Sequence, residues 1–498
     1  MTAPLTLPPQ RSPRLGFSLL LALLALVAAG KVVLADTLDP DCFWHLRVGE
    51  EIARQGWPHP LLDDLSFASI RQPWTPYSWL AELAMRRLWD AGGFRAAVAA
   101  AAILESAFII LLGLCALEFS ASVHGRPRYL ASALAATMGG ILSLAYLSFR
   151  PVTAALAALA LIAWLLLRDR RMNQTSKAVW LVPPITALLV NIHFYALFVP
   201  LWAAALFVGD ALQSSRFPRR PCALLLASLL ACCLTPMLPG TIRSVLDYSR
   251  NDVMVRSGTI AEFHPFYQGT MGHLSAAFVG LLLICAIWQF IRTRRLPLGE
   301  LIWLAGSTAL LFRLGRMAPV FAIIAVPVFA AVLPKLSDRI LARRPIVAIF
   351  AAALVLTAWP IARGFPRPTR SLSSWLNRNG PDAPNYPCAA ADYVERNIPA
   401  KTHHLICELT WGGYLEWRLG PNFQTLMDGR TQLFSPQFWS ALALGSEQQR
   451  RAYFAATPAD AAILRVPHNP FAEALTELGW KVVYRDEFAE VLVPPNHN

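Results

Sequence analysis

Two acids and a histidine stand close together in the segment DPDCFWHLRVGEEI, residues 39–52, directly after the first long apolar run. A carboxylate beside a dry cavity can take the proton of an incoming hydroxyl, which makes Asp41 and Asp39 candidate general bases. His45 follows Asp41 by four residues, so a helix through both would place them on one face. His45 then either contacts a substrate or has a structural role. The acids also suit a helix start, where Asp39 caps the first turn and Asp41 complements the helix dipole.

Further polar side chains stand at the ends of other apolar runs. Arg150 lies in SFRP, and Arg313 and Arg316 lie in RLGR. Arginine suits a planar, bidentate contact with a phosphate or a carboxylate, so these residues either bind an anionic substrate or pair with acids such as Asp41 and Asp64.

The remaining candidates for the site are an amide, an imidazole, an indole and two acids. Asn191 and His193, in VNIHF, either line a cavity or cap a helix, and Trp44 adds an aromatic surface beside His45. Asp64, next to Asp63, and Glu82 are further acids, each of which would also suit a turn or an interfacial position. The complete set of candidate site residues is Asp41, Asp39 and Asp64 for catalysis, and His45, Trp44, Glu82, Arg150, Asn191, His193, Arg313 and Arg316 for substrate binding.

The composition indicates where these residues must be held. The chain has 498 residues, 55% of them hydrophobic and 15% charged, which is typical of a polytopic membrane protein. The net charge of +13 is spread in short clusters between apolar runs, which favours membrane orientation over binding of nucleic acid. The eight cysteines show no metal-binding spacing and no dense disulfide pattern.

About eleven apolar runs are candidates for membrane-spanning helices. They lie at about 15–35, 96–117, 129–148, 152–167, 178–190, 194–212, 222–237, 273–291, 298–312, 317–334 and 346–362. Lys and Arg collect in alternate short loops, which predicts that the N terminus is inside, the C-terminal part is outside, and the chain crosses the cytoplasmic membrane of a bacterium many times. The basic residues that mark the inner loops are Arg11, Arg14, Arg126, Arg128, Arg168, Arg170, Arg171, Lys177, Arg216, Arg219, Arg220, Arg292, Arg294, Arg295, Lys335, Arg339, Arg343 and Arg344.

This topology divides the chain into a transmembrane domain over residues 1–362, a linker over 363–386 and a domain outside the membrane over 387–498. Within the first part, the long outer loop 36–95 contains two expected interfacial helices, from Asp39 to Arg54 and from Ser78 to Trp89. Its other acids and all the candidate arginines fall on the same outer side.

The last part of the sequence alternates short apolar strands with helical stretches, which predicts a small α/β domain. The expected strands are HLIC, QTLM, AAIL, KVVY and EVLV, and the expected helices are CAAADYVERN, PQFWSALALGSEQQRRAYFA and NPFAEALTELG. WGGY and DGR in the same region are expected to be turns that build the sheet, with contact to a sugar or an acceptor as the alternative.

Taken together, these features describe an outward-facing cavity with acids for proton abstraction and arginines for phosphate. Such a cavity would suit transfer from a lipid-phosphate donor whose prenyl tail stays in the bilayer.

The order of several short motifs resembles the GT-C superfamily of membrane glycosyltransferases, which includes the lipid-A aminoarabinose transferases and the oligosaccharide glycosyltransferases of lipopolysaccharide cores. The closest resemblance is to a bacterial branch without a settled activity. The matching residues are Asp41, Trp44-His45-Leu46 and Gly49, then Asp64, Ser66, Trp74, Trp79 and Glu82, then Arg150-Pro151, Asn191-Ile192-His193, Arg316 with Pro319, Trp411 to Trp417, and Asp428-Gly429-Arg430. One departure is Cys42-Phe43 before Trp44, where the branch has another tryptophan, which would alter substrate packing.

The resemblance implies an inverting transfer from a polyprenyl-phosphate sugar to a lipid, glycan or protein acceptor, with an acid of the first outer loop as general base. Carried over by position, Asp41 would be the base, Asp39 the next candidate and Asp64 a second acid, and the arginines would bind the donor phosphate. No cofactor is certain, although paired acids could bind Mg²⁺ or Mn²⁺. Two other functions remain open, a transporter or flippase for lipid-linked sugars and a noncatalytic membrane scaffold.

Overall fold

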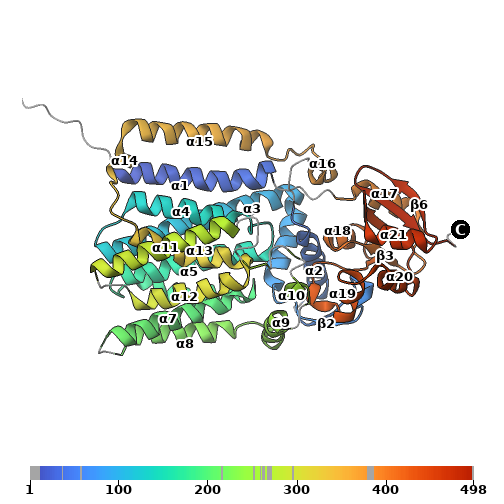
Figure 1. The fold of residues 1–498 in the computed structure, drawn as a ribbon, viewed down its shortest axis with the longest axis horizontal. Coiled ribbons are helices and arrows are strands. Elements are labelled where there is room, and N and C mark those ends of the chain that lie inside the picture. Colours follow the sequence, from blue (N-terminus) through green and yellow to red (C-terminus); the bar gives the residue numbers. More distant parts are fainter. Residues whose placement is uncertain are drawn as a thin grey trace, which may run out of the picture.

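The computed structural model describes residues 12–35, 38–56, 59–214, 217–250, 253–257, 260, 264–265, 272–293, 297–377 and 386–495. Long helices run side by side through one end of the molecule, and a smaller domain of helices and strands forms the other end (Figure 1). Helix α2 (Asp41–Gln55) lies between these two parts. The polar residues at the helix ends on this side therefore face the C-terminal domain.

The helices of the bundle coincide with the predicted apolar runs. Their bounds are α1 (Pro13–Gly30), α3 (Trp79–His124), α4 (Tyr129–Leu144), α5 (Pro151–Arg171), α6 (Val182–Leu189), α7 (Phe198–Gln213), α8 (Arg219–Cys232), α11 (Gly272–Thr293), α12 (Leu298–Arg313), α13 (Ala318–Val332) and α15 (Arg344–Gly364). Seven helical segments of the described chain are long and apolar enough to cross a membrane, whereas α4 and the segment Lys177–Leu189 are shorter. The polytopic helical fold is confirmed, and the count of about eleven spans stays a prediction.

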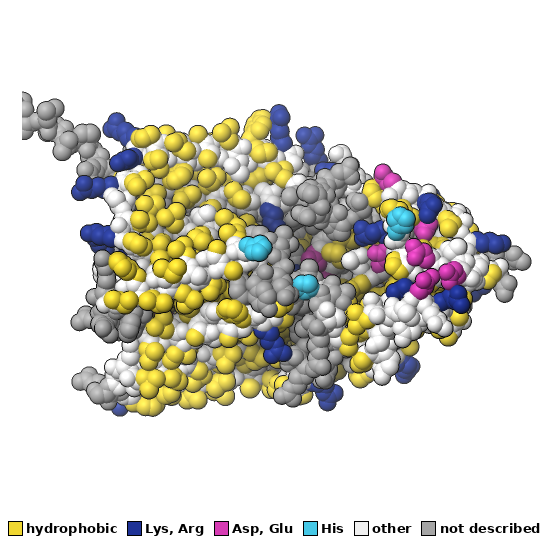
Figure 2. All heavy atoms as spheres, viewed as in Figure 1, with side chains coloured by type: hydrophobic (Ala, Val, Ile, Leu, Met, Phe, Trp, Pro, Cys, Tyr) yellow, Lys and Arg dark blue, Asp and Glu magenta, His cyan; other side chains and the backbone are white. Residues whose placement is uncertain are grey.

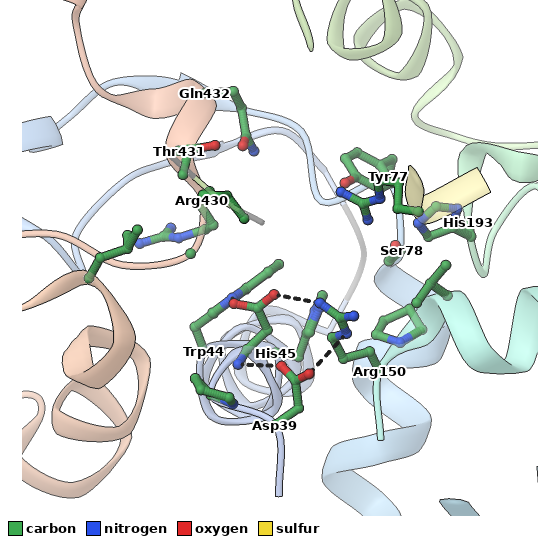
Figure 3. Close-up of a pocket in the computed structure, with 18 of the residues that line it drawn as sticks. Asp39, Trp44, His45, Tyr77, Ser78, Arg150, His193, Arg430, Thr431 and Gln432 are labelled. Carbon is green, nitrogen blue, oxygen red and sulfur yellow. Dashed lines mark hydrogen bonds and ion pairs between the residues drawn. The ribbon is translucent and has the colours of Figure 1, made fainter. Parts of the chain in front are cut away.

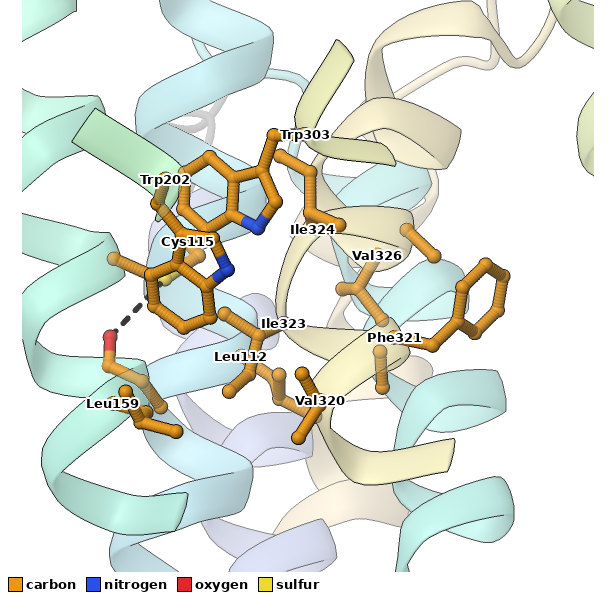
Figure 4. Close-up of a cluster of buried hydrophobic side chains, with 14 of the residues drawn as sticks. Leu112, Cys115, Leu159, Trp202, Trp303, Val320, Phe321, Ile323, Ile324 and Val326 are labelled. Carbon is orange, nitrogen blue, oxygen red and sulfur yellow. Dashed lines mark hydrogen bonds between the residues drawn. The ribbon is translucent and has the colours of Figure 1, made fainter. Parts of the chain in front are cut away.

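Helix α13 is the centre of the bundle. It begins with Pro at its second position, a residue whose fixed φ suits the first helical turn, and all of its residues are buried. Its apolar side chains pack among α3, α4, α5, α11 and α12, and Figure 4 shows Phe321 and Ile324 in this cluster. A helix packed on all sides provides a rigid support for the residues just before it, which include Arg316.

The outer surface of the bundle is hydrophobic on the face seen in Figure 2, where apolar side chains cover most of the helical region. Lys and Arg side chains gather at the end remote from the C-terminal domain, and acidic side chains lie mainly on that domain. An apolar belt with basic residues gathered at one end is typical of a helical membrane protein.

The first outer loop begins with α2, where Pro40 precedes the helix and Gly56 ends it in the left-handed conformation at φ 79°. A short antiparallel pair follows, β1 (Leu61–Leu62) with β2 (Pro73–Trp74). The second predicted helix of the loop is the first part of α3, which breaks at Gly93, a glycine with φ 58°. The chain can bend at Gly93 because glycine tolerates positive φ. The interfacial part of α3 is thus separated from the part that runs through the bundle.

The C-terminal domain has a five-stranded sheet in the order β4-β3-β5-β7-β6. Strand β3 is parallel to β4 and β5, and β7 is antiparallel to β5 and β6. The strands are β3 (His404–Cys407), β4 (Gln424–Thr425), β5 (Ala461–Arg465), β6 (Lys481–Arg485) and β7 (Ala489–Val493), and the helices are α17 (Cys388–Asn397), α18 (Leu409–Leu419), α19 (Pro436–Leu442), α20 (Glu447–Ala455) and α21 (Pro470–Glu477). All five predicted strand segments are present, whereas the predicted helix over 436–455 is two helices.

The prediction of a turn at WGGY is wrong, because these residues lie in α18. The two glycines reflect close packing of this helix. A Cβ at Gly412 would lie 1.8 Å from the carbonyl oxygen of Met427, and a Cβ at Gly413 would lie 3.1 Å from the carbonyl oxygen of Pro40. Helix α18 therefore packs directly on the start of α2, which brings the C-terminal domain to Asp41.

Candidate functional site

A cavity of about 400 Å³ lies where the ends of the bundle helices meet the C-terminal domain. Three groups of side chains face one another across it in Figure 3: residues of α2, residues of the helical bundle, and residues 430–432 of the C-terminal domain. The predicted site residues that line it are Asp39, Asp41, Trp44, His45, Arg150, His193 and Arg316. The structure thus brings together seven of the eleven predicted residues.

Asp41 occupies the first turn of α2 and has both carboxylate oxygens engaged. Oδ1 accepts a hydrogen bond from Trp44 Nε1 at 3.1 Å, and Oδ2 accepts one from Arg150 Nη1 at 3.1 Å. Asp39 stabilises the helix start, since its Oδ1 accepts from the backbone N–H of Asp41 at 3.0 Å. These bonds hold the Asp41 carboxylate at the cavity wall.

Arg150 joins the bundle to α2. It precedes α5 as the N-cap residue, and its Nε donates to Ser148 Oγ at 2.9 Å. Arg150 Nε also lies 3.4 Å from Asp39 Oδ2, so the guanidinium pairs with both acids. Arg150 therefore pairs with acids, as one of the two interpretations expected, and it also lines the cavity, whereas its binding of an anionic substrate stays a prediction.

His45 and Glu82 form a buried pair between α2 and α3. His45 Nδ1 lies 3.0 Å from Glu82 Oε1, and the ring lies against that of Trp44 with centroids 3.5 Å apart and the ring planes tilted by 32°. Burial lowers the pKa of His45, although the bond to Glu82 opposes that effect. His45 lines the cavity, whereas Glu82 lies behind it.

Asn191 and His193 differ in position although they are two residues apart. The Asn191 side chain accepts from Trp79 Nε1 at 2.8 Å and donates to the carbonyl oxygens of Ala187 and Leu234, so it joins helix ends and does not line the cavity. His193 does line it, with Nδ1 accepting from the backbone N–H of Tyr195 at 3.2 Å. Burial, followed by the nearby charge of Arg316, lowers the pKa of His193 well below its usual value.

Two predicted residues lie away from this cavity. Arg313 is exposed at the end of α12, and Asp64 lines a second cavity of about 480 Å³ together with Glu51 and His59. Burial, with a smaller effect of Glu51, raises the pKa of Asp64.

One wall of the main cavity comes from the C-terminal domain, where the sequence offered only DGR, and only as the alternative to a turn of the sheet. The lining residues from this domain are Leu409, Thr410, Gly429, Arg430, Thr431 and Gln432. Gly429 approaches the candidate base closely, because a Cβ there would lie 2.1 Å from Asp41 Oδ1. The DGR motif was the available signal, and a loop that contacts the site fits it better than a turn within the sheet.

Arg430 of the same motif is fully buried in a cluster of acids. Its Nη1 donates to Asp63 Oδ1 at 2.7 Å, its Nε donates to both oxygens of Asp428 at 3.0 Å, and its Nη2 donates to Asp428 Oδ2. Its guanidinium carbon also lies 5.1 Å from the ring centre of Trp74. Asp63 and Trp74 belong to the first outer loop, so Arg430 attaches the C-terminal domain to that loop.

Phe43, the departure from the resembling motif, lies away from the cavity. It is fully buried and packs edge-on against Tyr386 and Tyr414, with ring centres 5.4 Å and 5.2 Å away. Its aromatic contacts stabilise the packing of α2 on α18. Phe43 therefore does not contact the cavity, and any effect of this departure on substrate packing would act through the packing of α2 on α18.

Solved structures with a similar fold are membrane enzymes. The structure of ArnT from Cupriavidus metallidurans in the apo state matches with a TM-score of 0.53 and 15% identity over 97% of this chain and 98% of that one. The archaeal oligosaccharyltransferase AglB from Archaeoglobus fulgidus, in complex with an inhibitory peptide and a dolichol-phosphate, matches with a TM-score of 0.51 and 14% identity over 90% of this chain and 69% of that one.

Both enzymes belong to the GT-C superfamily. The chain has the GT-C fold. No protein-family model matches the sequence, and no curated protein sequence matches it either. The fold expected from the short motifs is therefore confirmed by structure alone.

In the part of the chain that the structure describes, no group of three or more His, Cys, Asp or Glu side chains is arranged to hold a metal ion. Asp39 and Asp41 are both paired with Arg150, and Asp64 lies at the second cavity. The possible Mg²⁺ or Mn²⁺ stays a prediction. All eight cysteines are free thiols, including Cys388 and Cys407.

Proposed function

We propose that the protein transfers a sugar from a polyprenyl-phosphate donor to an acceptor hydroxyl at the outer face of the bacterial cytoplasmic membrane, with inversion and with Asp41 as general base. The observation that carries this proposal is the pairing of Asp41 with Arg150 on one cavity, at 3.1 Å. A base for the acceptor and a cation for the phosphate are the two groups that such a displacement needs on the protein.

The phosphate side of the cavity contains cationic groups. They are Arg150, which pairs with Asp39 and Asp41, and Arg316, and the N-terminal end of α5, which begins at Pro151, contributes the positive end of a helix dipole. Arg316 lies in the single turn Gly315–Met317 before α13, the most buried helix of the bundle. A phosphate bound here would lie at the outer ends of apolar helices, so its prenyl chain could extend into the bilayer.

The acceptor side is formed by α2 and the C-terminal domain. Asp41 lies beside Gly429, and Thr410, Thr431 and Gln432 line the same side of the cavity. Hydroxyl and amide side chains can hydrogen-bond a hydroxylated acceptor while Asp41 takes its proton. Asp39 is the weaker candidate for the base, because its carboxylate accepts a hydrogen bond from the backbone N–H of Asp41 and so supports the helix start.

The comparisons support the donor class. AglB, which has this fold, was solved with a dolichol-phosphate, and ArnT shares the fold over nearly the whole of both chains. The proposed orientation places the N terminus inside and the C-terminal domain outside, in agreement with the basic end of the bundle in Figure 2.

A transfer assay tests the function. The full-length protein in detergent is incubated with radiolabelled polyprenyl-phosphate sugars and a membrane lipid extract as the source of acceptors. We expect release of the polyprenyl phosphate and appearance of labelled product, and Asp41→Asn should lower the rate by about 10³-fold because the general base is lost.

The control variant is Asp90→Asn, an exposed acid on the interfacial part of α3 that does not line the cavity. If the protein in liposomes moves the labelled donor across the liposome membrane without forming product, it would instead be a flippase. Equal turnover by the wild type and by Asp41→Asn would contradict the assignment of the base.

A further inference from the structure

We propose that His45, oriented by Glu82, takes up a proton when the phosphate of the lipid-linked donor enters the cavity, and that the resulting imidazolium stabilises the departing phosphate. This inference rests on the proposed function and adds to it a residue that acts on the leaving group. It follows from the packing of α2 on α3, from two polar atoms without partners, and from the charges that face the ring.

The packing of the two helices fixes the orientation of His45. Gly49, one turn after His45, faces α3 so closely that a Cβ there would lie 2.2 Å from the carbonyl oxygen of Glu82. The spacing of His45 and Gly49 thus places the imidazole and the close helix contact on one face of α2. Glu82 can then reach His45 Nδ1 at 3.0 Å, with both side chains buried.

The bond to Glu82 decides which ring nitrogen is available to a ligand. A carboxylate oxygen only accepts, so Nδ1 carries the hydrogen in this bond. In neutral imidazole the other nitrogen, Nε2, then has a lone pair and can take a proton. The contact with Glu82 is the single hydrogen bond of the His45 side chain in the described part of the chain.

Two buried polar atoms next to this pair have no hydrogen-bond partner among the described residues, Glu82 Oε2 and Ser78 Oγ. Ser78 is the N-cap residue of α3 and lines the cavity, yet its hydroxyl does not cap the helix as serine usually does at this position. Buried polar groups are nearly always bonded, so these atoms need an explanation. A phosphate oxygen can accept from Ser78, and the unbonded oxygen of Glu82 leaves negative charge beside a protonated His45.

The charges around His45 come from every element packed against it. Asp41 lies on the same helix and Glu82 on α3, whereas Arg150 precedes α5, His193 lies before the turn Phe194–Leu197, and Arg430 belongs to the C-terminal domain. Burial, together with the two arginines, lowers the pKa of His45, so the ring is neutral at neutral pH without a ligand. A bound phosphate reverses this balance, because its negative charge favours the imidazolium.

The chemistry of the leaving group explains why this proton matters. When the bond between the anomeric carbon and the phosphate oxygen breaks, its electron pair stays on that oxygen, and the phosphate changes from singly to doubly negative. The acceptor oxygen forms the new bond to the anomeric carbon, and its proton goes to Asp41. The hydrogen bond from His45 Nε2 strengthens as the second charge develops, so it favours the transition state over the bound donor.

The test uses undecaprenyl methyl phosphate, a phosphodiester with a single charge that does not titrate near neutral pH. Its binding to the full-length protein in detergent is measured by calorimetry at pH 7.5 in two buffers with different ionisation enthalpies. We expect the wild type to take up on the order of one proton per lipid bound. His45→Gln and Glu82→Gln should bind the lipid with little proton uptake, and His273→Gln, at an exposed position on α11, should behave as the wild type does.

The outcomes separate this inference from the proposed function. Binding to the wild type without proton uptake, or uptake that persists in His45→Gln, would overturn the role of His45 while lipid-phosphate binding stands. If the wild type does not bind the lipid at all, both proposals fail. Binding to the wild type without proton uptake would overturn the role of His45 even if a variant at His45 does not fold, and Glu82→Gln then serves as the second variant.

Discussion

Two arginines contact the first outer loop from different parts of the chain, and they differ in exposure. Arg430 has no exposed side-chain surface, and all three of its guanidinium nitrogens donate to Asp63 or Asp428. Arg150 is 13% exposed, pairs with Asp39 and Asp41, and faces the cavity. The same set of groups, one guanidinium with two carboxylates, is therefore buried around Arg430 and accessible from the cavity around Arg150.

The difference indicates different roles. Burial, followed by the charge of Asp428, raises the pKa of nearby Glu416 well above its usual value, which favours its neutral form and leaves the charge of Arg430 to Asp63 and Asp428. A ligand that binds Arg430 would have to break its hydrogen bonds to Asp63 and Asp428. Because the cluster is buried, water could not replace those bonds. Arg150 can exchange a carboxylate for a phosphate at the cavity surface, which is what a binding residue must do. Arg430 fixes the C-terminal domain to the outer loop, and Arg150 is the proposed binding residue.

The largest expected effect is the loss of the enclosed cluster. Arg430→Met leaves Asp63 and Asp428 buried without their cation, which should cost about 3–5 kcal/mol in the association of the C-terminal domain with the outer loop. The measurement is the thermal unfolding of the protein in detergent, followed by tryptophan fluorescence, together with the rate of proteolysis in the segment before α17. Asp63→Asn should show a smaller loss in the same direction. Unchanged unfolding and proteolysis in Arg430→Met would show that the cluster does not hold the two parts together.

Gly429 belongs to the same DGR motif as Arg430. Its substitution tests whether the buried cluster around Arg430 positions Asp41 at the cavity. Gly429→Ala adds a Cβ 2.1 Å from Asp41 Oδ1, so the carboxylate must move while the backbone remains acceptable. We expect transfer to fall by about 10²-fold, because a displacement near 1 Å of a catalytic group has effects of that size. Thermal unfolding should change little.

The matched control for this variant is Gly306→Ala, since a Cβ at Gly306 on α12 would meet nothing within 4 Å. Equal activity of Gly429→Ala and the wild type would mean that the C-terminal loop does not position Asp41.

Substitution of Arg150, the accessible arginine, should weaken binding of the lipid phosphate without lowering the stability of the fold. Arg150→Lys keeps the positive charge but loses the planar group that reaches both acids and a phosphate, so the Kd for undecaprenyl methyl phosphate should rise by about tenfold. Calorimetry on the full-length protein measures this change. Arg313→Lys, at an exposed arginine that does not line the cavity, is the control and should leave Kd unchanged. A loss of thermal stability in Arg150→Lys with unchanged Kd would make Arg150 a structural residue like Arg430.

Much of the helical architecture could be predicted because it depends on local patterns. The apolar runs indicate where helices lie, and Pro40 with the following acid indicates the start of α2. The strands of the C-terminal domain were visible as short apolar segments between turn residues. Seven candidate residues share the cavity because each is a polar group at the outer end of a helix, where the sequence alone places it.

The other side of the cavity depends on contacts between distant parts of the chain. Arg430 and Asp63 are separated by 367 positions, and no local pattern indicates that they meet. The closeness of Gly429 to Asp41 likewise follows from the packing of α18 on α2. Asn191 looked like a cavity residue because it is polar and two residues from His193, but its hydrogen bonds to Trp79 and Leu234 direct it into the junction of helices. Tertiary packing determines which of these side chains face the cavity.

The smallest effect on stability is expected at a third arginine, Arg451. Its ion pair separates the effect of the N–O distance from the effect of burial. Arg451 Nη1 lies 3.0 Å from Glu477 Oε2, close to the 3.1 Å that joins Arg150 to Asp41, but its side chain is 52% exposed. Water and salt screen such a pair, so Arg451→Ala should change the stability by less than about 0.5 kcal/mol, with no measurable shift in thermal unfolding. If this variant were destabilised as much as Arg430→Met, distance alone would govern these ion pairs. Burial could then no longer account for the different roles of Arg430 and Arg150.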